Sequence, residues 1–482
     1  MKAIKSTGIL LLSEILSKGI AFLLVPLYSY VVEPKDFGKV AILQLLFTVF
    51  FLIVSFSLNS TFDKYFFDKK FKSTDSLFST ILVVQILAVV FGSSLYILLG
   101  SKLALFLEIK NALYLDLVFY TSIIAVFFPV VNSYLICSGQ IKRAGIYAIL
   151  ISMIRSTMAL VLVLNMKDKI LAIILANFVE HLSGLILSLP YYFKRLKLRL
   201  IEKNKIRELI VYSCLFFPSS FSVFFVKFSD RLMIQYFLNY QSLGIYSMGT
   251  RLVNIPGQFI STINKNFTPQ MYQSISENDT TKLNQLIRLF LAAIFVLLSG
   301  LILFSKELFL IIGGDYKNAY TVFIILSLCS YFNGYNLIIQ PVKTYFKKYV
   351  KYKSMIWVSI GVINIILNII FIPIYGINGA AAVTAISYLI SIPFSYYYAR
   401  KAYKENYYLK WFMLSSVVLF SISLLLIFYK NENSILEFFI RLLSFLLIGY
   451  IFLSKLIDIR EWSIKLHSFI IKKIRAFNNN KK

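Results

Sequence analysis

Hydrophobic residues occur along this chain in long runs separated by short polar segments. Each run is about 20 residues or longer, the length a helix needs to cross the hydrocarbon core of a bilayer. About fourteen such runs predict an all-α integral membrane protein with about 14 transmembrane helices. The predicted spans are 6–32, 37–61, 76–99, 112–137, 144–165, 170–193, 209–238, 243–270, 284–305, 318–341, 354–373, 377–399, 410–428 and 435–454.

Composition agrees with this pattern and argues against an enzyme. Of the 482 residues, 59% are hydrophobic and only 15% are charged, whereas a soluble domain has about a quarter charged residues. The sequence contains no glycine-rich phosphate loop, no metal-spaced Cys/His set and no Ser–His–acid arrangement. Its three cysteines are scattered through apolar runs. We therefore predict no catalytic residue, no metal and no cofactor.

The formal net charge of +28 reflects membrane topology rather than nucleic-acid binding. Basic residues are concentrated in alternate loops, which is how cytoplasmic loops are marked in multi-span proteins. The same alternate set of loops is the more basic one along the whole chain. It predicts an even number of spans, with both termini in the cytoplasm.

The most basic loop, residues 194–208, divides the sequence into similar halves. Residues 1–193 hold spans 1–6, and residues 209–400 hold spans 7–12. Because six is an even number, these lobes would be parallel repeats. Gly38 and Gly244 lie at matching positions, each just after the outer turn that follows the first span of its half.

The remaining residues form an appendage to the two lobes. Residues 401–454 hold spans 13 and 14. Residues 455–482 combine helical apolar spacing with basic charge, which predicts an amphipathic helix on the anionic inner leaflet. The alternative for this tail is a solvated, partly disordered basic segment.

Charged side chains inside the spans are the main functional signal. A charge at the bilayer centre costs about 2.5–3.5 kcal/mol on insertion scales, so such residues are paired or functional. The cations are Lys18, Arg155, Lys227, Arg231 and Arg251, and the acids are Glu14, Glu180 and Asp230. A cationic, low-dielectric site attracts anions, and arginine binds phosphate as a bidentate fork. The surplus of cations therefore predicts an anionic cargo, with phosphate or pyrophosphate a good fit.

Some of these charges have a simpler interpretation as pairs. Glu14 and Lys18 are four residues apart and are either an ion pair or a tuned cavity cation. Arg155 is equally a substrate contact or the partner of Glu180.

Three further features of the spans bear on the transport mechanism. Glu180 and His181 could titrate as proton-coupling groups. Lys227, Asp230 and Arg231 are spaced to share one helix face, where one acid leaves a positive surplus. Pro256 and Gly257 form the predicted hinge in span 8.

Several segments, taken in order, resemble the Wzx-type polysaccharide and O-antigen flippases. These belong to the polysaccharide transporter family of the multidrug/oligosaccharidyl-lipid/polysaccharide exporter superfamily. The resemblance covers about residues 1–400. The matching segments are Pro26 with Asp36-Phe37-Gly38, then Pro218, Asp230-Arg231, Leu243-Gly244-Ile245-Tyr246 and Pro269, then Gly314-Asp315-Tyr316-Lys317-Asn318-Ala319, Asn364-Ile365-Ile366-Leu367-Asn368 and Ile372-Pro373-Ile374-Tyr375-Gly376-Ile377-Asn378-Gly379-Ala380-Ala381.

The resemblance implies two six-helix lobes around a central cavity, with two additional C-terminal helices. It implies a flippase that moves a polyprenyl-diphosphate-linked oligosaccharide to the outer leaflet of the bacterial cytoplasmic (inner) membrane by alternating access. The glycan would serve a surface polysaccharide such as O-antigen or capsule. Coupling to a proton or sodium gradient stays open, and polysaccharide polymerase machinery is a candidate partner. The rivals are a drug/cation antiporter of the same superfamily and a membrane polysaccharide polymerase or ligase.

Overall fold

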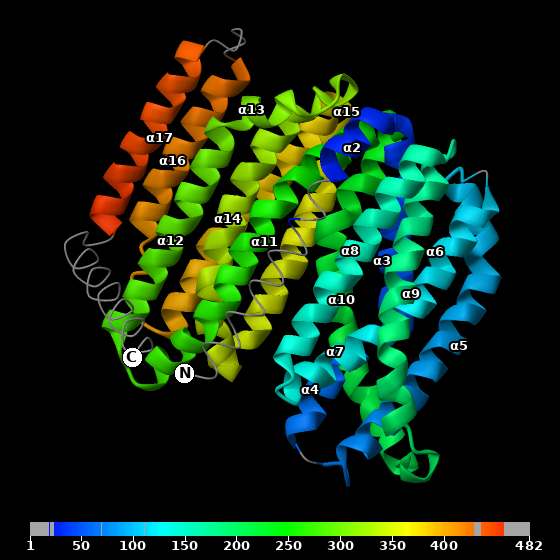
Figure 1. Ribbon diagram of the computed structural model, residues 1–482. Coiled ribbons are helices and arrows are strands. Elements are labelled where there is room, and N and C mark those ends of the chain that lie inside the picture. Colours follow the sequence, from blue (N-terminus) through cyan, green and yellow to red (C-terminus); the bar gives the residue numbers. More distant parts are fainter. Residues whose placement is uncertain (1–18, 20–23, 69, 110, 429–434, 457–482) are drawn as a thin grey trace, which may run out of the picture. The chain divides into compact units, whose positions relative to one another are not determined.

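The helices follow the predicted apolar runs closely (Figure 1). The computed structural model describes residues 19, 24–68, 70–109, 111–428 and 435–456. The α-helices are α2 (Leu24–Val31), α3 (Pro34–Ser55), α4 (Leu58–Asp68), α5 (Thr74–Phe106), α6 (Ala112–Ala125), α7 (Phe127–Cys137), α8 (Ile141–Asn165), α9 (Lys169–Arg195), α10 (Lys203–Phe237), α11 (Tyr240–Ser276), α12 (Thr280–Leu303), α13 (Ser305–Leu310), α14 (Ala319–Tyr345), α15 (Lys347–Ala402), α16 (Leu409–Phe428) and α17 (Ile435–Leu456). Two short 3₁₀ turns, η1 (Leu198–Leu200) and η2 (Gly314–Tyr316), complete the described structure.

The length and apolarity of these helices confirm an all-α, multi-pass membrane protein. Within the described ranges, nine helical stretches are long and apolar enough to cross a membrane. Eight of them are single spans of 20–35 residues, and the ninth is Met355–Ala402, at 48 residues. That last stretch contains the predicted spans 354–373 and 377–399. They meet at Gly376, whose φ of 61° and ψ of −143° are not helical and suit only a residue without a Cβ.

Two predicted spans are interrupted where a proline or residues with positive φ angles break the regular hydrogen bonding of the helix. Span 112–137 divides into α6 and α7, because Pro129 cannot donate an amide hydrogen bond inside the helix. Side chains from other helices also donate to two carbonyls at this break: Gln85 Nε2 donates to Val126 O at 2.6 Å and Tyr192 Oη to Phe127 O at 3.0 Å. Span 37–61 divides into α3 and α4 at Phe56 and Ser57, which both have positive φ angles.

The chain forms two compact units. The first comprises Met1–Ile255, Ile311–Phe323 and Trp357–Ser387, and the second Pro256–Leu310, Ile324–Ile356 and Tyr388–Lys482. Inside the first unit, α9 packs against α6 and α8, and α3 packs against α5 and α6. These packed pairs surround the polar residues described below. The predicted lobes, 1–193 and 209–400 with their linker, stay a prediction.

An aromatic cluster holds the first unit together at the end of α5 where Phe78 lies. The ring of Phe78 contacts those of Phe62, Tyr134 and Tyr192, with centroid separations of 5.0–6.3 Å. All four side chains are buried. Such contacts join α4, α5, α7 and α9, and burying rings of this size dominates core energetics.

The predicted basic linker 194–208 is attached to the start of α5 by ion pairs. Asp75 accepts from Arg195 Nη1 at 2.8 Å and from Lys197 Nζ at 2.9 Å. At the start of α10, hydrogen bonds from Lys205 and Lys70 hold the pKa of Glu208 at about 2. The linker thus fixes the ends of α9 and α10, two helices that carry candidate site residues.

The predicted C-terminal spans are helices α16 and α17, and both pack against α12 in the second unit. Two ion pairs attach α17: Lys306 Nζ lies 3.4 Å from Glu437 Oε2, and Arg441 Nη2 lies 2.7 Å from Glu307 Oε1. These pairs satisfy charges that would otherwise be costly at a membrane helix. The predicted amphipathic tail falls on residues 455–482, of which 457–482 lie outside the described residues.

Candidate functional site: a cationic cavity in the first unit

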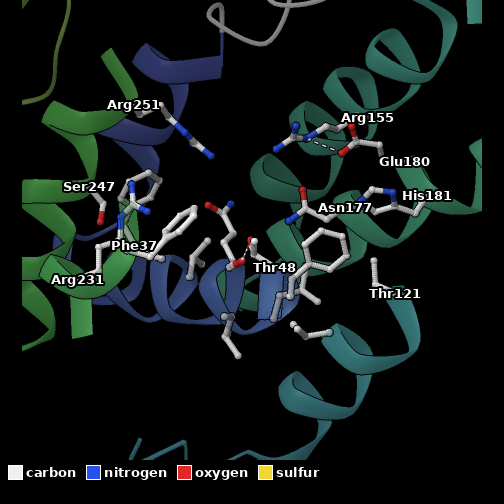
Figure 2. A pocket seen from close by; sticks show the side chains of 18 of the residues that line it. Phe37, Thr48, Thr121, Arg155, Asn177, Glu180, His181, Arg231, Ser247 and Arg251 are labelled. Carbon is white, nitrogen blue, oxygen red and sulfur yellow. Dashed lines mark hydrogen bonds and ion pairs between the residues drawn. The ribbon is translucent and has the colours of Figure 1, made fainter. Parts of the chain in front are cut away.

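A polar cavity of about 360 Å³ lies among the helices of the first unit (Figure 2). Helix α3 forms one wall, with α6, α8, α9, α10 and α11 contributing the others. The lining residues used below are Phe37, Gln44, Phe47, Thr48, Asn177, Phe228, Ser247 and Asn254, together with five candidates from the sequence: Arg155, Glu180, His181, Arg231 and Arg251. Since α3, α6, α8 and α9 lie in stretches that are long and apolar enough to cross a membrane, a polar cavity beside them marks a binding site or pathway.

Three of the five predicted substrate-binding cations line this cavity. Arg155 comes from α8, Arg231 from α10 and Arg251 from α11, and their side chains extend towards the same space (Figure 2). Glu180 is the only carboxylate among the described lining residues. Three arginines against one glutamate leave a surplus of two positive charges when His181 is neutral. The cavity is therefore suited to an anion.

The predicted pair of Arg155 and Glu180 is present. Arg155 Nε lies 3.1 Å from Glu180 Oε2, and both side chains are about one quarter exposed. His181 is stacked on Phe47, with ring centroids 4.9 Å apart. Because the ion pair uses the Nε of Arg155, its two Nη groups are the donors that could bind an anion.

Arg251 is held by aromatic rings rather than by a carboxylate. Its guanidinium carbon lies 4.9 Å from the ring centroid of Tyr28 and 5.1 Å from that of Phe37. It forms no ion pair with any described residue, and its Nη1 is buried without a hydrogen-bond partner. A buried, unsatisfied guanidinium donor is costly unless a ligand occupies it, which makes Arg251 the clearest candidate for an anion contact.

Asp230 does not share the cavity face with Arg231, so that expectation is wrong. Consecutive residues on a helix point in different directions, about 100° apart. Arg231 reaches the cavity, where its guanidinium lies 4.6 Å from the Phe228 ring centroid. The Asp230 carboxylate is instead buried, where it accepts hydrogen bonds from Tyr246 Oη and from the Arg231 amide.

Beside Asp230 lies a buried network of neutral polar side chains. Ser229 Oγ donates to Asn364 Oδ1 at 3.3 Å, and Asn364 Nδ2 donates to Ser387 Oγ at 3.1 Å. Asn368 Nδ2 also donates to Asn364 Oδ1, at 2.9 Å, while its own Oδ1 is buried without a hydrogen-bond partner among the described side chains. The network joins α10 to both parts of α15 in the first unit.

Sequence reasoning missed the uncharged polar residues of the cavity. Gln44, Thr48, Asn177 and Asn254 all line it. Gln44 and Thr48 are four residues apart, and Asn177 precedes Glu180 by three, so each pair shares a helix face. Polar residues at this spacing inside an apolar span are the signal that could have identified them.

Other predicted site residues do not join this group. Glu14 and Lys18 lie outside the described residues, and the side chain of Lys227 does as well. Pro256 and Gly257 lie within α11, which stays helical through both of them, so the expected break in span 8 is absent. Their role as a hinge remains a prediction.

A second cavity, of about 450 Å³, adjoins the first and is mostly apolar. The two cavities share Phe47, Arg155, Glu180 and His181. The rest of the second lining includes Phe51, Phe128, Pro129 and Ile151. The Arg155–Glu180 pair therefore stands where a polar compartment meets an apolar one.

A bundle of membrane-spanning helices around a cationic cavity defines a membrane transporter. The family model for polysaccharide biosynthesis proteins matches residues 3–274, more than half of the sequence, and the chain belongs to that family. The match confirms the family resemblance read from the sequence.

Individual proteins agree with this assignment. The chain is 24% identical to the "probable low-salt glycan biosynthesis flippase Agl15" of Haloferax volcanii, over 54% of this chain and 57% of that protein. Its fold is similar to that of the lipid II flippase MurJ in an inward closed conformation, with a TM-score of 0.71 and 16% identity, covering 95% and 98% of the two chains. An inward-facing MATE family multidrug transporter of the MOP superfamily gives a TM-score of 0.61 at 13% identity, covering 86% of this chain and 95% of the other. These likenesses confirm the predicted fold class.

Proposed function

We propose that this protein is a flippase that moves a polyprenyl-diphosphate-linked oligosaccharide from the cytoplasmic to the outer leaflet by alternating access. The observation that carries the proposal is the convergence of Arg155, Arg231 and Arg251 on one cavity. Guanidinium groups neutralise a diphosphate, which lowers the cost of bringing that dianion through a low-dielectric interior. Family membership and the glycan flippase relative support this cargo.

The proposal includes where the protein acts and what it does not do. It would work in a bacterial cytoplasmic membrane with both termini in the cytoplasm, and supply glycan for a surface polysaccharide such as O-antigen or capsule. Transport needs no covalent step, so no residue is assigned a catalytic role. Polysaccharide polymerase machinery, which would consume the exported glycan, is the proposed partner.

The charge of the cavity favours this function over the rivals. A drug/cation antiporter would need acidic groups to attract its substrate, yet the described lining holds three arginines and one glutamate. A polymerase or ligase would need catalytic residues in a sizeable outer segment. The outer segments between described helices, such as 107–111 and 238–239, are short.

Deletion of the gene is expected to trap the lipid-linked glycan on the cytoplasmic leaflet. Intact cells would be treated with a membrane-impermeant glycosidase, and the protected fraction of lipid-linked glycan measured. Protection should rise in the deletion strain and return to normal when the gene is restored. An unchanged outer pool would overturn the flippase assignment, and new sensitivity to cationic drugs would instead favour the antiporter.

We further propose that transport is coupled to a proton or a sodium gradient. The candidate groups are Glu180 and His181 at the cavity and the buried Asp230. Either carboxylate is neutralised when it binds a proton or a sodium ion, and the imidazole of His181 can bind a proton. In energised membrane vesicles, a protonophore or a sodium ionophore should each be tested for its effect on glycan translocation. One of the two should stop net transport; full activity with both gradients collapsed would exclude this coupling.

A further inference from the structure

Helices α3 and α11 approach one another at two glycines, so closely that no other residue fits. A Cβ atom on Gly38 would lie 1.9 Å from the carbonyl oxygen of Tyr240. A Cβ atom on Gly244 would lie 1.8 Å from the carbonyl oxygen of Pro34. Both distances are far below van der Waals contact, and both obstacles are backbone atoms, which do not rotate away. Small residues permit such backbone contacts in membranes.

The two contacts are equivalent under the internal repeat. Tyr240 follows Pro34, and Gly244 follows Gly38, by the same 206 positions. Each glycine therefore meets the first helical residue of the opposite helix, as in an isologous interface where residue i contacts j and j contacts i. This close contact, formed by Gly38, Tyr240, Gly244 and Pro34, is called the glycine interlock below.

Hydrogen bonds surround the interlock in a similarly reciprocal way. The Tyr240 hydroxyl donates to the carbonyl of Leu107, which follows α5 in the first half. The Tyr316 hydroxyl, in η2 of the second half, donates to Val32 O at 2.8 Å. Leu107 and Tyr316 each lie in the loop after the third span of their own half. Each contacts a residue of the other half near its first outer turn: Tyr240 at the start of the second span, and Val32 at the end of the first span. All of these residues belong to the first compact unit.

The interlock lies one helical turn from the cationic cavity. Phe37, adjacent to Gly38, lines the cavity and contacts Arg251. Ser247, three residues after Gly244, lines it from α11. By the predicted topology, this end of α3 and α11 is the outer end. Separation of the two glycines would therefore connect the cavity with the outside.

We propose that Gly38 and Gly244 form the outer gate of the cavity: they close α3 on α11 while cargo is taken up and must part to release it. The identity of the cargo rests on the proposed function, whereas the close contact of the two glycines does not depend on it. An added methyl group at either glycine would hold the gate open and shift the protein towards an outward-open state.

The test measures access to the cavity directly, without any glycan. In a full-length background with the three native cysteines replaced by serine, Ser247→Cys is labelled in intact cells with a membrane-impermeant maleimide. Gly38→Ala and Gly244→Ala should each raise the labelling rate about tenfold or more, since overpacking destabilises the closed state. Gly314→Ala is the matched control because no atom lies within 4 Å of its added Cβ, and it should leave the rate unchanged.

A milder pair of variants keeps the test decisive if the alanine variants fold poorly. Tyr240→Phe and Tyr316→Phe each remove one gate hydroxyl and keep the ring, so labelling should rise severalfold in both. Equal labelling rates in all folded variants would overturn the gate, as would a rise seen only from the cytoplasmic side in inverted vesicles. Raised labelling in the glycine variants, together with an unchanged outer glycan pool in the deletion strain, would keep the gate and reject the flippase function.

Discussion

Arg231→Ala is expected to reduce glycan export by about ten- to a hundredfold, and Arg155→Ala and Arg251→Ala should have effects of the same order. A hydrogen bond to a charged group contributes about 1.5–3 kcal/mol, and about 1.4 kcal/mol corresponds to a factor of ten. Arg231 and Arg251 pair with no described carboxylate, so their charge is available to the cargo. Export is measured as the glycosidase-accessible fraction of lipid-linked glycan.

The pattern across substitutions separates an anion contact from a structural role. Arg231→Lys keeps the charge but loses the planar fork, so it should restore export only partly. Arg143→Ala is the matched control: this exposed arginine contacts Gln140 at the start of α8, away from the cavity. Normal export by all three cavity variants, in protein that reaches the membrane in normal amount, would remove the arginines from the proposed site.

Tyr246→Phe is expected to destabilise the protein by about 1–3 kcal/mol, because it leaves the buried Asp230 carboxylate without its side-chain donor. Tyr246 is 1% exposed and Asp230 is 7% exposed, so water does not readily replace the lost hydroxyl. Tyr375→Phe removes a hydroxyl from a side chain that is 61% exposed and should change stability by less than about 0.5 kcal/mol. Thermal unfolding of the purified proteins in one detergent compares the two.

Asp230→Asn in the Tyr246→Phe background shows whether the carboxylate causes the loss. A neutral amide in place of the carboxylate removes the buried unsatisfied charge, so the double variant should recover much of the stability. If Tyr246→Phe and Tyr375→Phe melt at the same temperature, the hydroxyl contributes nothing and the buried hydrogen bond has no energetic role.

The family match and the fold agree with what the apolar runs indicated, and the reason is physical. Inside a bilayer every backbone amide must be satisfied within its own segment, so a long apolar run has almost no option but a helix. Runs such as 144–165 and 410–428 therefore predicted α8 and α16 to within a few residues. The prediction and the structure differ in two spans. The helix of span 112–137 is interrupted near Pro129, and the helix of span 37–61 is interrupted at Phe56 and Ser57.

The candidate site was only partly visible in the same way. Charges inside apolar runs stand out, which is why Arg155, Arg231 and Arg251 could be selected beforehand. Gln44, Asn177 and Asn254 barely alter hydropathy, and their shared cavity depends on how α3, α9 and α11 pack. Sequence spacing also misplaced Asp230, because only the packing of α10 against α11 directs its carboxylate to Tyr246.

The sequence by itself determined a polytopic helical membrane protein with a cationic interior, since span length and the cost of buried charge are local properties of each run. The tertiary structure alone decided which charges meet and which are separated. It also converted two glycines at matching positions into reciprocal contacts, Gly38 against Tyr240 and Gly244 against Pro34. Such contacts join residues more than 200 positions apart, and only the packing of whole helices brings them together.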